Sequence, residues 1–188
     1  VRAPDRLPEE YKVEDEKKIG DFRVCKGRGK VKIDYFAFKK KRLENDEVIG
    51  TERTDLDPIT LNTQVCWIEI PEDVKERLLM RASNKVESGV WDKGARYHYL
   101  GAIHAVEHSL IHMLPLLILI DEKDVGGIST DYQDELDSSA IFIYDGVEGG
   151  VGFSHDAYGK LSDLVERSLK NLSKCDCGSV KGCPACTF

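Results

Sequence analysis

The sequence predicts an α+β protein with a small, mostly antiparallel sheet, packed helices and a C-terminal four-cysteine zinc knuckle. Residues 30–35 alternate polar and apolar side chains, which is the period of a half-exposed strand. Further along the chain, apolar residues recur at the spacing of amphipathic helices. Four of the six cysteines then fall within residues 175–186. Strands first, helices later and a thiol cluster at the end indicate this fold class.

The composition is that of a globular protein. Its 188 residues suffice for one domain with its own core, and 41% hydrophobic with 32% charged residues is an ordinary balance. The net charge of −7 excludes a surface that is basic throughout but allows a local basic patch. The apolar stretch 97–120 contains several histidines and Glu107, so we expect no membrane span. The N-terminal residues carry no secretory signal, which favours a cytoplasmic protein.

The first seventy residues are expected to supply most of the sheet. Residues 1–21 are rich in Pro, Glu, Asp and Lys, and we interpret them as an arm or linker before a domain that spans residues 22–188. The next segments combine β-branched and aromatic residues with polar boundaries, which is typical of strands. We expect strands over residues 30–35, 37–43 and 63–70.

Helices are expected to follow the sheet. One helix opens after Pro71, with apolar residues at helical spacing and acids in its first turn. A second, more buried helix covers residues 99–113 and ends or kinks at Pro115, because proline cannot donate the next backbone hydrogen bond. A final helix over residues 154–172 leads directly into the cysteine cluster.

Two segments lie between the second and last helices. Residues 140–144 form a short, wholly apolar run that is suited to a buried strand. Residues 146–152 are rich in glycine, and we expect this loop to pack tightly against the helix at residues 99–113. The loop lacks the lysine of a Walker phosphate-binding pattern, so the sequence contains no recognisable ATP site.

The C-terminal cysteines are spaced C-x-C-x5-C-x2-C, and this spacing predicts a structural zinc site. Zinc binds four thiolates about 2.3 Å away in a tetrahedron, and two closely spaced pairs supply them. A disulfide is the alternative, but cysteines separated by a single residue are poorly placed to bond each other. Four thiolates leave no open position for a catalytic water, so we expect one structural ion. Its ligands are Cys175, Cys177, Cys183 and Cys186. The remaining two, Cys25 and Cys66, are expected to be buried thiols.

A histidine motif on the second predicted helix admits two interpretations. His104, Glu107 and His108 form H-x-x-E-H, which matches an inverted zinc-protease motif with the glutamate as base. A hydrolase would need a third ligand, for which Asp145 and Glu148 are candidates. Alternatively, the histidines are hydrogen-bonded inside a polar core. We favour this second interpretation because a five-residue motif arises easily by chance.

The segment 26–42 holds eight basic residues and one acid, interleaved with aromatic side chains. Cationic strands with aromatics are suited to a phosphate backbone and to stacked bases. An equally simple hypothesis is an edge strand protected by lysines, with its aromatics turned into the core. If the segment binds DNA, the contacts are expected from Lys39, Lys40, Lys41 and Arg42.

A series of motifs in the last ninety residues resembles a known family. In order, they are Gly101–His108, Leu114-Pro115, Asp124–Gly127, Phe142–Gly146, Gly149–Phe153 and the terminal cysteines. The series resembles the zinc-binding C-terminal domain of MrfA-like superfamily 2 DNA helicases, a group related to the RecQ4-like repair helicases. The basic strands from Val31 to Arg42 also resemble the part before it, so the likeness extends over residues 22–188.

The resemblance implies a function. It suggests an accessory zinc-binding domain of an ATP-dependent DNA helicase, in DNA repair or defence, which supports the motor and contacts single-stranded DNA without catalysis of its own. The motor is expected in the same polypeptide or as a separate partner, and no membrane is involved. Two alternatives stay open at this point: a zinc-dependent hydrolase that uses the histidine motif, and a pure protein-interaction module.

Overall fold

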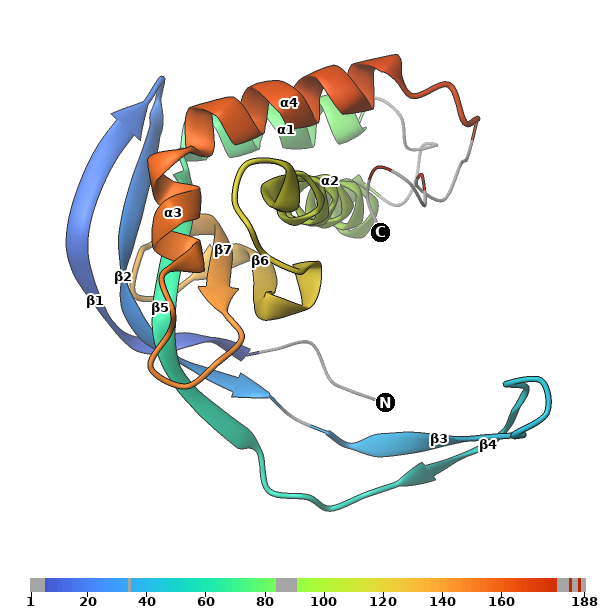
Figure 1. Ribbon diagram of the computed structural model, residues 1–188. Coiled ribbons are helices and arrows are strands. Elements are labelled where there is room, and N and C mark those ends of the chain that lie inside the picture. Colours follow the sequence, from blue (N-terminus) through green and yellow to red (C-terminus); the bar gives the residue numbers. More distant parts are fainter. Residues whose placement is uncertain (1–5, 34, 84–90, 179–182, 184–185, 187–188) are drawn as a thin grey trace.

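The computed structural model describes residues 6–33, 35–83, 91–178, 183 and 186. A five-stranded antiparallel sheet in the order β1-β2-β5-β7-β6 forms the body, and a separate two-stranded hairpin, β3-β4, extends away from it (Figure 1). The strands are β1 (Arg6–Ile19), β2 (Phe22–Ile33), β3 (Ala37–Lys41), β4 (Val48–Arg53), β5 (Ile59–Ile70), β6 (Val125–Gln133) and β7 (Ser138–Asp145). The helices are α1 (Glu72–Ser83), α2 (Trp91–Met113), α3 (Phe153–Gly159) and α4 (Leu161–Lys174), with 3-10 turns η1 (Leu114–Leu116) and η2 (Glu122–Asp124).

The predicted fold class is confirmed. The expected strands correspond to β2, β3, β5 and β7, although β2 and β5 are longer than expected. The helix after Pro71 is α1, whose first turn contains Glu72 and Asp73. Helix α2 ends at Met113, and Pro115 lies in the 3-10 turn that follows, as expected of a residue that cannot continue a helix. Within the described residues, no helix combines the length and apolar character needed to cross a membrane.

Residues 6–19 have a regular structure that their composition did not indicate. They form β1, which pairs with β2 at the edge of the sheet, rather than an extended arm. Charged residues dominate this strand, and its carboxylates face basic side chains of β2: Glu14 lies 3.3 Å from Arg28, and Asp15 lies 3.9 Å from Lys26. Cross-strand ion pairs therefore accompany a pairing that hydrophobic periodicity alone does not predict. The domain boundary at residue 21 stays a prediction.

Two other expectations are corrected. The final helix is divided into α3 and α4 at Lys160, and α3 begins after Gly152, whose φ of 102° is left-handed. Strand β6 was not expected, because Gly126 and Gly127 weaken the strand pattern. Gly127 is required by packing, since a Cβ there would lie 2.6 Å from the Glu107 Oε1 of α2.

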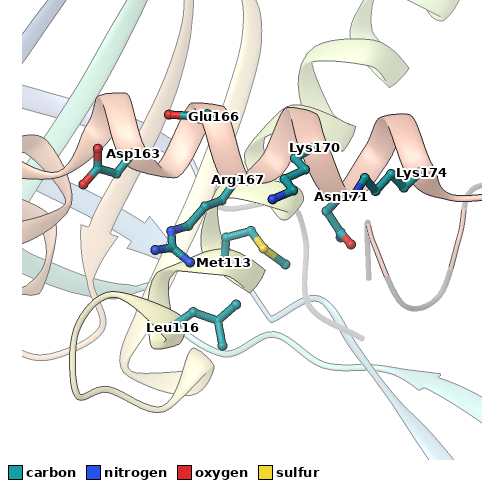
Figure 2. Close-up of a pocket in the computed structure, with 8 residues that line it drawn as sticks. All are labelled: Met113, Leu116, Asp163, Glu166, Arg167, Lys170, Asn171 and Lys174. Atoms are coloured by element: carbon teal, nitrogen blue, oxygen red, sulfur yellow. The ribbon is translucent and has the colours of Figure 1, made fainter.

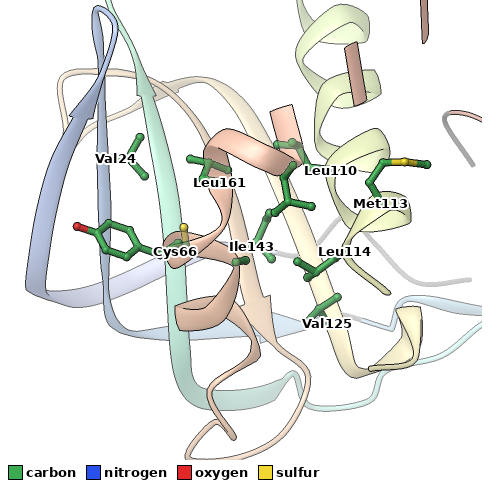
Figure 3. Packing of buried hydrophobic residues seen from close by; sticks show 11 residues of the cluster. Val24, Cys66, Leu110, Met113, Leu114, Val125, Ile143 and Leu161 are labelled. Carbon is green, nitrogen blue, oxygen red and sulfur yellow. The ribbon is translucent and has the colours of Figure 1, made fainter. Parts of the chain in front are cut away.

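The core occupies both faces of the curved sheet. On one face, Cys66 and Ile143 pack against Leu110 of α2 and Leu161 and Leu164 of α4 (Figure 3). On the opposite face the sheet curls on itself, so that β1 also contacts β6. The ring of Tyr11 lies 5.1 Å from that of Trp67, which is fully buried. The helices therefore cover one face only, while the strands enclose the other.

The two isolated cysteines are buried, as expected. Cys25 faces the enclosed side of the sheet and Cys66 faces the helices. Burial raises the pKa of the Cys25 thiol to about 11 and that of Cys66 to about 12. Both thiols are therefore neutral and unreactive packing groups at neutral pH.

Candidate metal centre and nucleic-acid interface

Three of the four predicted zinc ligands come together where α4 ends. Cys175 follows the last helical residue, Lys174, with extended backbone, and its N–H donates to Leu172 O at 3.3 Å. The Sγ atoms of Cys175, Cys183 and Cys186 all lie within 4.8 Å of one another. A tetrahedral zinc with Zn–S bonds of about 2.3 Å places its sulfurs about 3.8 Å apart, so the arrangement fits the metal.

Cys177 is exposed and lies outside this group of three, whereas Cys186 is buried. Cys186 is only 5% exposed, and its N–H donates to Cys183 O at 3.1 Å, which closes a tight turn between the second pair. The structure therefore brings together three of the four predicted ligands, and their chemistry and spacing match a structural zinc site that links the end of α4 to Cys183 and Cys186. Cys177 as the fourth ligand stays a prediction.

Helix α4 is positioned by α2, the central helix. Its Leu161 and Leu164 are buried, and the hydroxyl of Ser168 donates to Ser109 O of α2 at 3.3 Å. An open groove of about 580 Å³ lies between α4 and the end of α2 with the turn η1 (Figure 2). Sequence reasoning missed this groove, although the i, i+3, i+7 spacing of its basic residues was a signal. Its lining residues are Met113, Leu116, Asp163, Glu166, Arg167, Lys170, Asn171 and Lys174.

The histidine motif also forms a cluster. His104 Nδ1 lies 3.1 Å from the Oε2 of Glu107, and His104 Nε2 lies 3.1 Å from the Nε2 of His108. Glu107 is 3% exposed, whereas His104 is largely exposed. The expected hydrogen bonds are therefore present, but the pair of rings lies at the surface rather than inside a polar core.

The glycine-rich loop lies on β5 and not on the histidine helix, which corrects the expectation for residues 146–152. A Cβ on Gly150 would lie 2.6 Å from Gln64 Cγ of β5, and the N–H of Gly149 donates to Asn62 O at 2.7 Å. Glu148 accepts hydrogen bonds from the backbone and side chain of Asn62. The carboxylate of Asp145 accepts four backbone N–H bonds at the start of α3. Both candidate third ligands thus have structural roles in this loop.

The predicted DNA-binding residues lie on the β3-β4 hairpin, and all four are exposed. Lys40 pairs with Glu52 across the hairpin, Lys41 lies 3.7 Å from Asp46, and Arg42 lies 3.8 Å from Glu47. The neighbouring aromatics are also exposed: Phe36 by 50%, Phe38 by 46% and Tyr35 by 36%. The hypothesis of an edge strand whose aromatics enter the core is therefore not what the structure shows.

This chain has relatives among known proteins. Residues 106–187 match the family model described as the MrfA zinc-binding domain. An uncharacterised protein of Methanocaldococcus jannaschii, MJ1572.1, is 38% identical over 89 residues, which are 46% of this chain and 78% of that protein. The chain belongs to the MrfA zinc-binding domain family. The resemblance in the motif series is thereby confirmed, and with it the structural zinc ion.

Two other similar proteins are much longer than this chain. The ATP-dependent helicase YprA of Bacillus subtilis is 26% identical over 152 residues, which are 79% of this chain and 17% of that protein. The ATP-dependent helicase hrq1 of Schizosaccharomyces pombe is 23% identical over 177 residues, or 89% of this chain and 15% of that protein. The chain therefore spans less than a fifth of these two helicases.

Solved structures share the fold along the whole chain. The DUF1998 helicase MrfA bound to DNA matches with a TM-score of 0.63 and 23% identity, covering 100% of this chain and 22% of that one. A second structure of the helicase MrfA matches with a TM-score of 0.55 and 17% identity, covering 97% and 22%. The match includes the N-terminal strands, which lie outside the segment that the family model covers.

Proposed function

We propose that this chain is the accessory zinc-binding domain of an ATP-dependent DNA helicase and that its β3-β4 hairpin contacts single-stranded DNA. The observation that carries the proposal is the hairpin itself, which extends away from the sheet (Figure 1). Basic and aromatic side chains are exposed together on it. The likeness to MrfA, a helicase whose structure was determined with DNA bound, supports it. The motor domains act in the same polypeptide or as a partner, in the cytoplasm.

The basic side chains of β2 and those of the β3-β4 hairpin differ in how accessible they are to a phosphate. On β2, Lys26 and Lys30 face carboxylates of β1, and their side chains are only 28% and 31% exposed. On the hairpin, the ion pairs of Lys41 and Arg42 join side chains that are more than half exposed. Exposed ion pairs contribute about 0–1 kcal/mol, so a phosphate can replace such a carboxylate at little cost. Exposed rings such as those of Phe36 and Phe38 offer stacking surfaces worth about 1–3 kcal/mol per base.

The domain has no catalysis of its own in this proposal. A hydrolase would need Glu107 to reach a metal-bound water, but its carboxylate is buried against His104. The candidate ligands Asp145 and Glu148 are held by backbone amides of their own loop and by Asn62. These contacts argue against metal-dependent hydrolysis and favour a supporting role.

Salt-dependent DNA binding tests the proposal. We expect the domain to bind single strands weakly because of its net charge of −7, and to lose affinity steeply with salt. Each neutralised phosphate adds about 0.7 to the log–log salt slope for a single strand, so replacing three lysines by glutamine should lower the slope by about 2. The variant is Lys39→Gln/Lys40→Gln/Lys41→Gln, measured by fluorescence anisotropy with a labelled oligonucleotide.

A matched control removes the same charge elsewhere. Lys12, Lys18 and Lys123 are exposed and lie away from the hairpin, so their triple glutamine variant should keep the wild-type slope. Zinc content and thermal melting must be unchanged in both variants. An unaltered slope in the hairpin variant, or an equal decrease in the control, would contradict the hairpin contact. An absence of single-strand binding at low salt would favour a pure protein-interaction module.

A further inference from the structure

His104 and His108 present two ring nitrogens to each other at the surface of α2. They are one helical turn apart, their ring centroids lie 4.4 Å from each other, and the two Nε2 atoms are separated by 3.1 Å. Two donor atoms on a tetrahedral zinc with Zn–N bonds of about 2.0–2.1 Å are separated by about 3.3 Å. The two histidines are therefore spaced as neighbouring ligands of one ion.

Glu107 determines which nitrogen of His104 is available. Its buried carboxylate lies 3.1 Å from His104 Nδ1 and, when ionised, can only accept a hydrogen bond. Nδ1 then carries the proton, and the lone pair of a neutral His104 ring is on Nε2, the nitrogen that lies beside His108 Nε2. A ligating histidine commonly donates its other N–H to a carboxylate in this way, which fixes the tautomer and the ring orientation. The hydroxyl of Ser129 in β6, 3.3 Å from the same Nδ1, further holds the ring.

We propose that His104 and His108 form a second metal site, for a late first-row divalent cation such as Zn²⁺ or Ni²⁺, with Glu107 as the positioning residue. Imidazole nitrogen suits these ions. The site differs from the cysteine knuckle because it is open: His104 is largely exposed, so water completes the coordination. Within the described part of the chain, His104, Glu107 and His108 are the histidine-containing group whose donor atoms come within 4.8 Å of one another. Bound metal would join successive turns of α2 where this helix meets β6.

Metal stoichiometry tests the site independently of DNA binding. The chain, without affinity-tag histidines, is first loaded with one equivalent of Zn²⁺, because four thiolates favour zinc. Ni²⁺ is then titrated by calorimetry, and native mass spectrometry counts both metals. We expect the wild-type chain to hold one Zn²⁺ and one Ni²⁺. His104→Ala and His108→Ala should each lose the Ni²⁺ and keep the Zn²⁺. Because His104→Ala also removes a hydrogen-bond partner of the buried Glu107 carboxylate, thermal melting must show that both variants are folded.

Two further variants separate a metal site from a structural hydrogen bond. Glu107→Gln should keep the stoichiometry but lower the Ni²⁺ affinity by about 10–100-fold, the usual effect of losing such a partner. His98→Ala is the matched control, since His98 is exposed on the same helix and outside the cluster, and it should bind Ni²⁺ as the wild type does. If the wild-type chain takes up no Ni²⁺, or if both histidine variants still bind it, the proposal is wrong and the two rings share only an N–H···N bond.

Discussion

We expect the carboxylate of Asp145 to stabilise the glycine-rich loop more than any other side-chain group does. It lies at the end of β7 and is fully buried. One oxygen accepts N–H bonds from Val151, Gly152 and Phe153 at 2.7, 2.7 and 3.2 Å, and the other accepts from Ser154 at 2.7 Å. The carboxylate therefore satisfies the free backbone donors at the start of α3, and these donors have no other helical partner.

The effect of Asp145→Asn follows from this geometry. The amide oxygen can replace the oxygen that takes three bonds, but the amide NH₂ then faces the N–H of Ser154. An unsatisfied buried donor costs about 1–3 kcal/mol, and changing the other three bonds from charged to neutral acceptors costs about 1 kcal/mol each. Because these contributions are not additive, we expect a loss of about 3–5 kcal/mol in the free energy of unfolding.

Urea unfolding, followed by the fluorescence of the buried Trp67, measures this loss by linear extrapolation. Asp156→Asn is the matched control, because Asp156 is exposed in the first turn of the same helix and should change stability by less than about 0.5 kcal/mol. Zinc must be saturating throughout. If Asp145→Asn unfolds within about 1 kcal/mol of Asp156→Asn, the reasoning about charged acceptors at this position is refuted.

Two further predictions concern the knuckle and the contact between α2 and β6. Cys183→Ser should lower zinc content and the melting temperature, because structural zinc contributes on the order of 10 kcal/mol of apparent binding energy in small peptides. The upstream sheet should stay folded on its own core, and a variant with full zinc and an unchanged melt would exclude this ligand. Gly127→Ala should destabilise by about 1–3 kcal/mol, since its Cβ would meet both Glu107 and Ile111 at 2.6 Å. Gly101→Ala on the exposed side of α2, where a Cβ meets nothing within 4 Å, should instead stabilise by about 0.5–1 kcal/mol. Denaturant titration of both variants measures their free energies of unfolding, and equal changes in the two variants would contradict the packing argument.

Periodicity and spacing were sufficient for the elements with strong local signals. The apolar run of β7, the amphipathic α1 and α4 and the stop at Pro115 each follow from a few neighbouring residues. The cysteine spacing likewise predicts a zinc knuckle, because the ligands lie close together in sequence. Local patterns of this kind need no information about the rest of the chain.

Elements that depend on distant partners were not predictable from the sequence. Strand β1 has a linker-like composition and is held by cross-strand charges on β2. Strand β6 begins with Val125 and two glycines. The second glycine is required because the carboxylate of Glu107, which is distant in sequence, leaves no room for a Cβ there. The position of the glycine-rich loop was missed for the same reason, since the side chain that holds it to β5, Glu148, reaches across to Asn62.

The way the β3-β4 hairpin is anchored has a mechanical consequence. Strand β3 follows β2 along the chain and β4 precedes β5. Strands β2 and β5 are adjacent in the sheet and paired from Arg23–Glu69 to Ile33–Ile59. A pull on the hairpin along its length acts on both strands from the same end. The ladders of β2 with β1 and of β5 with β7 are then loaded in shear, and their hydrogen bonds resist together. A hairpin peeled from a sheet edge would instead give way one bond at a time. Tension on the hairpin therefore enters the sheet at two inner strands rather than at an edge strand.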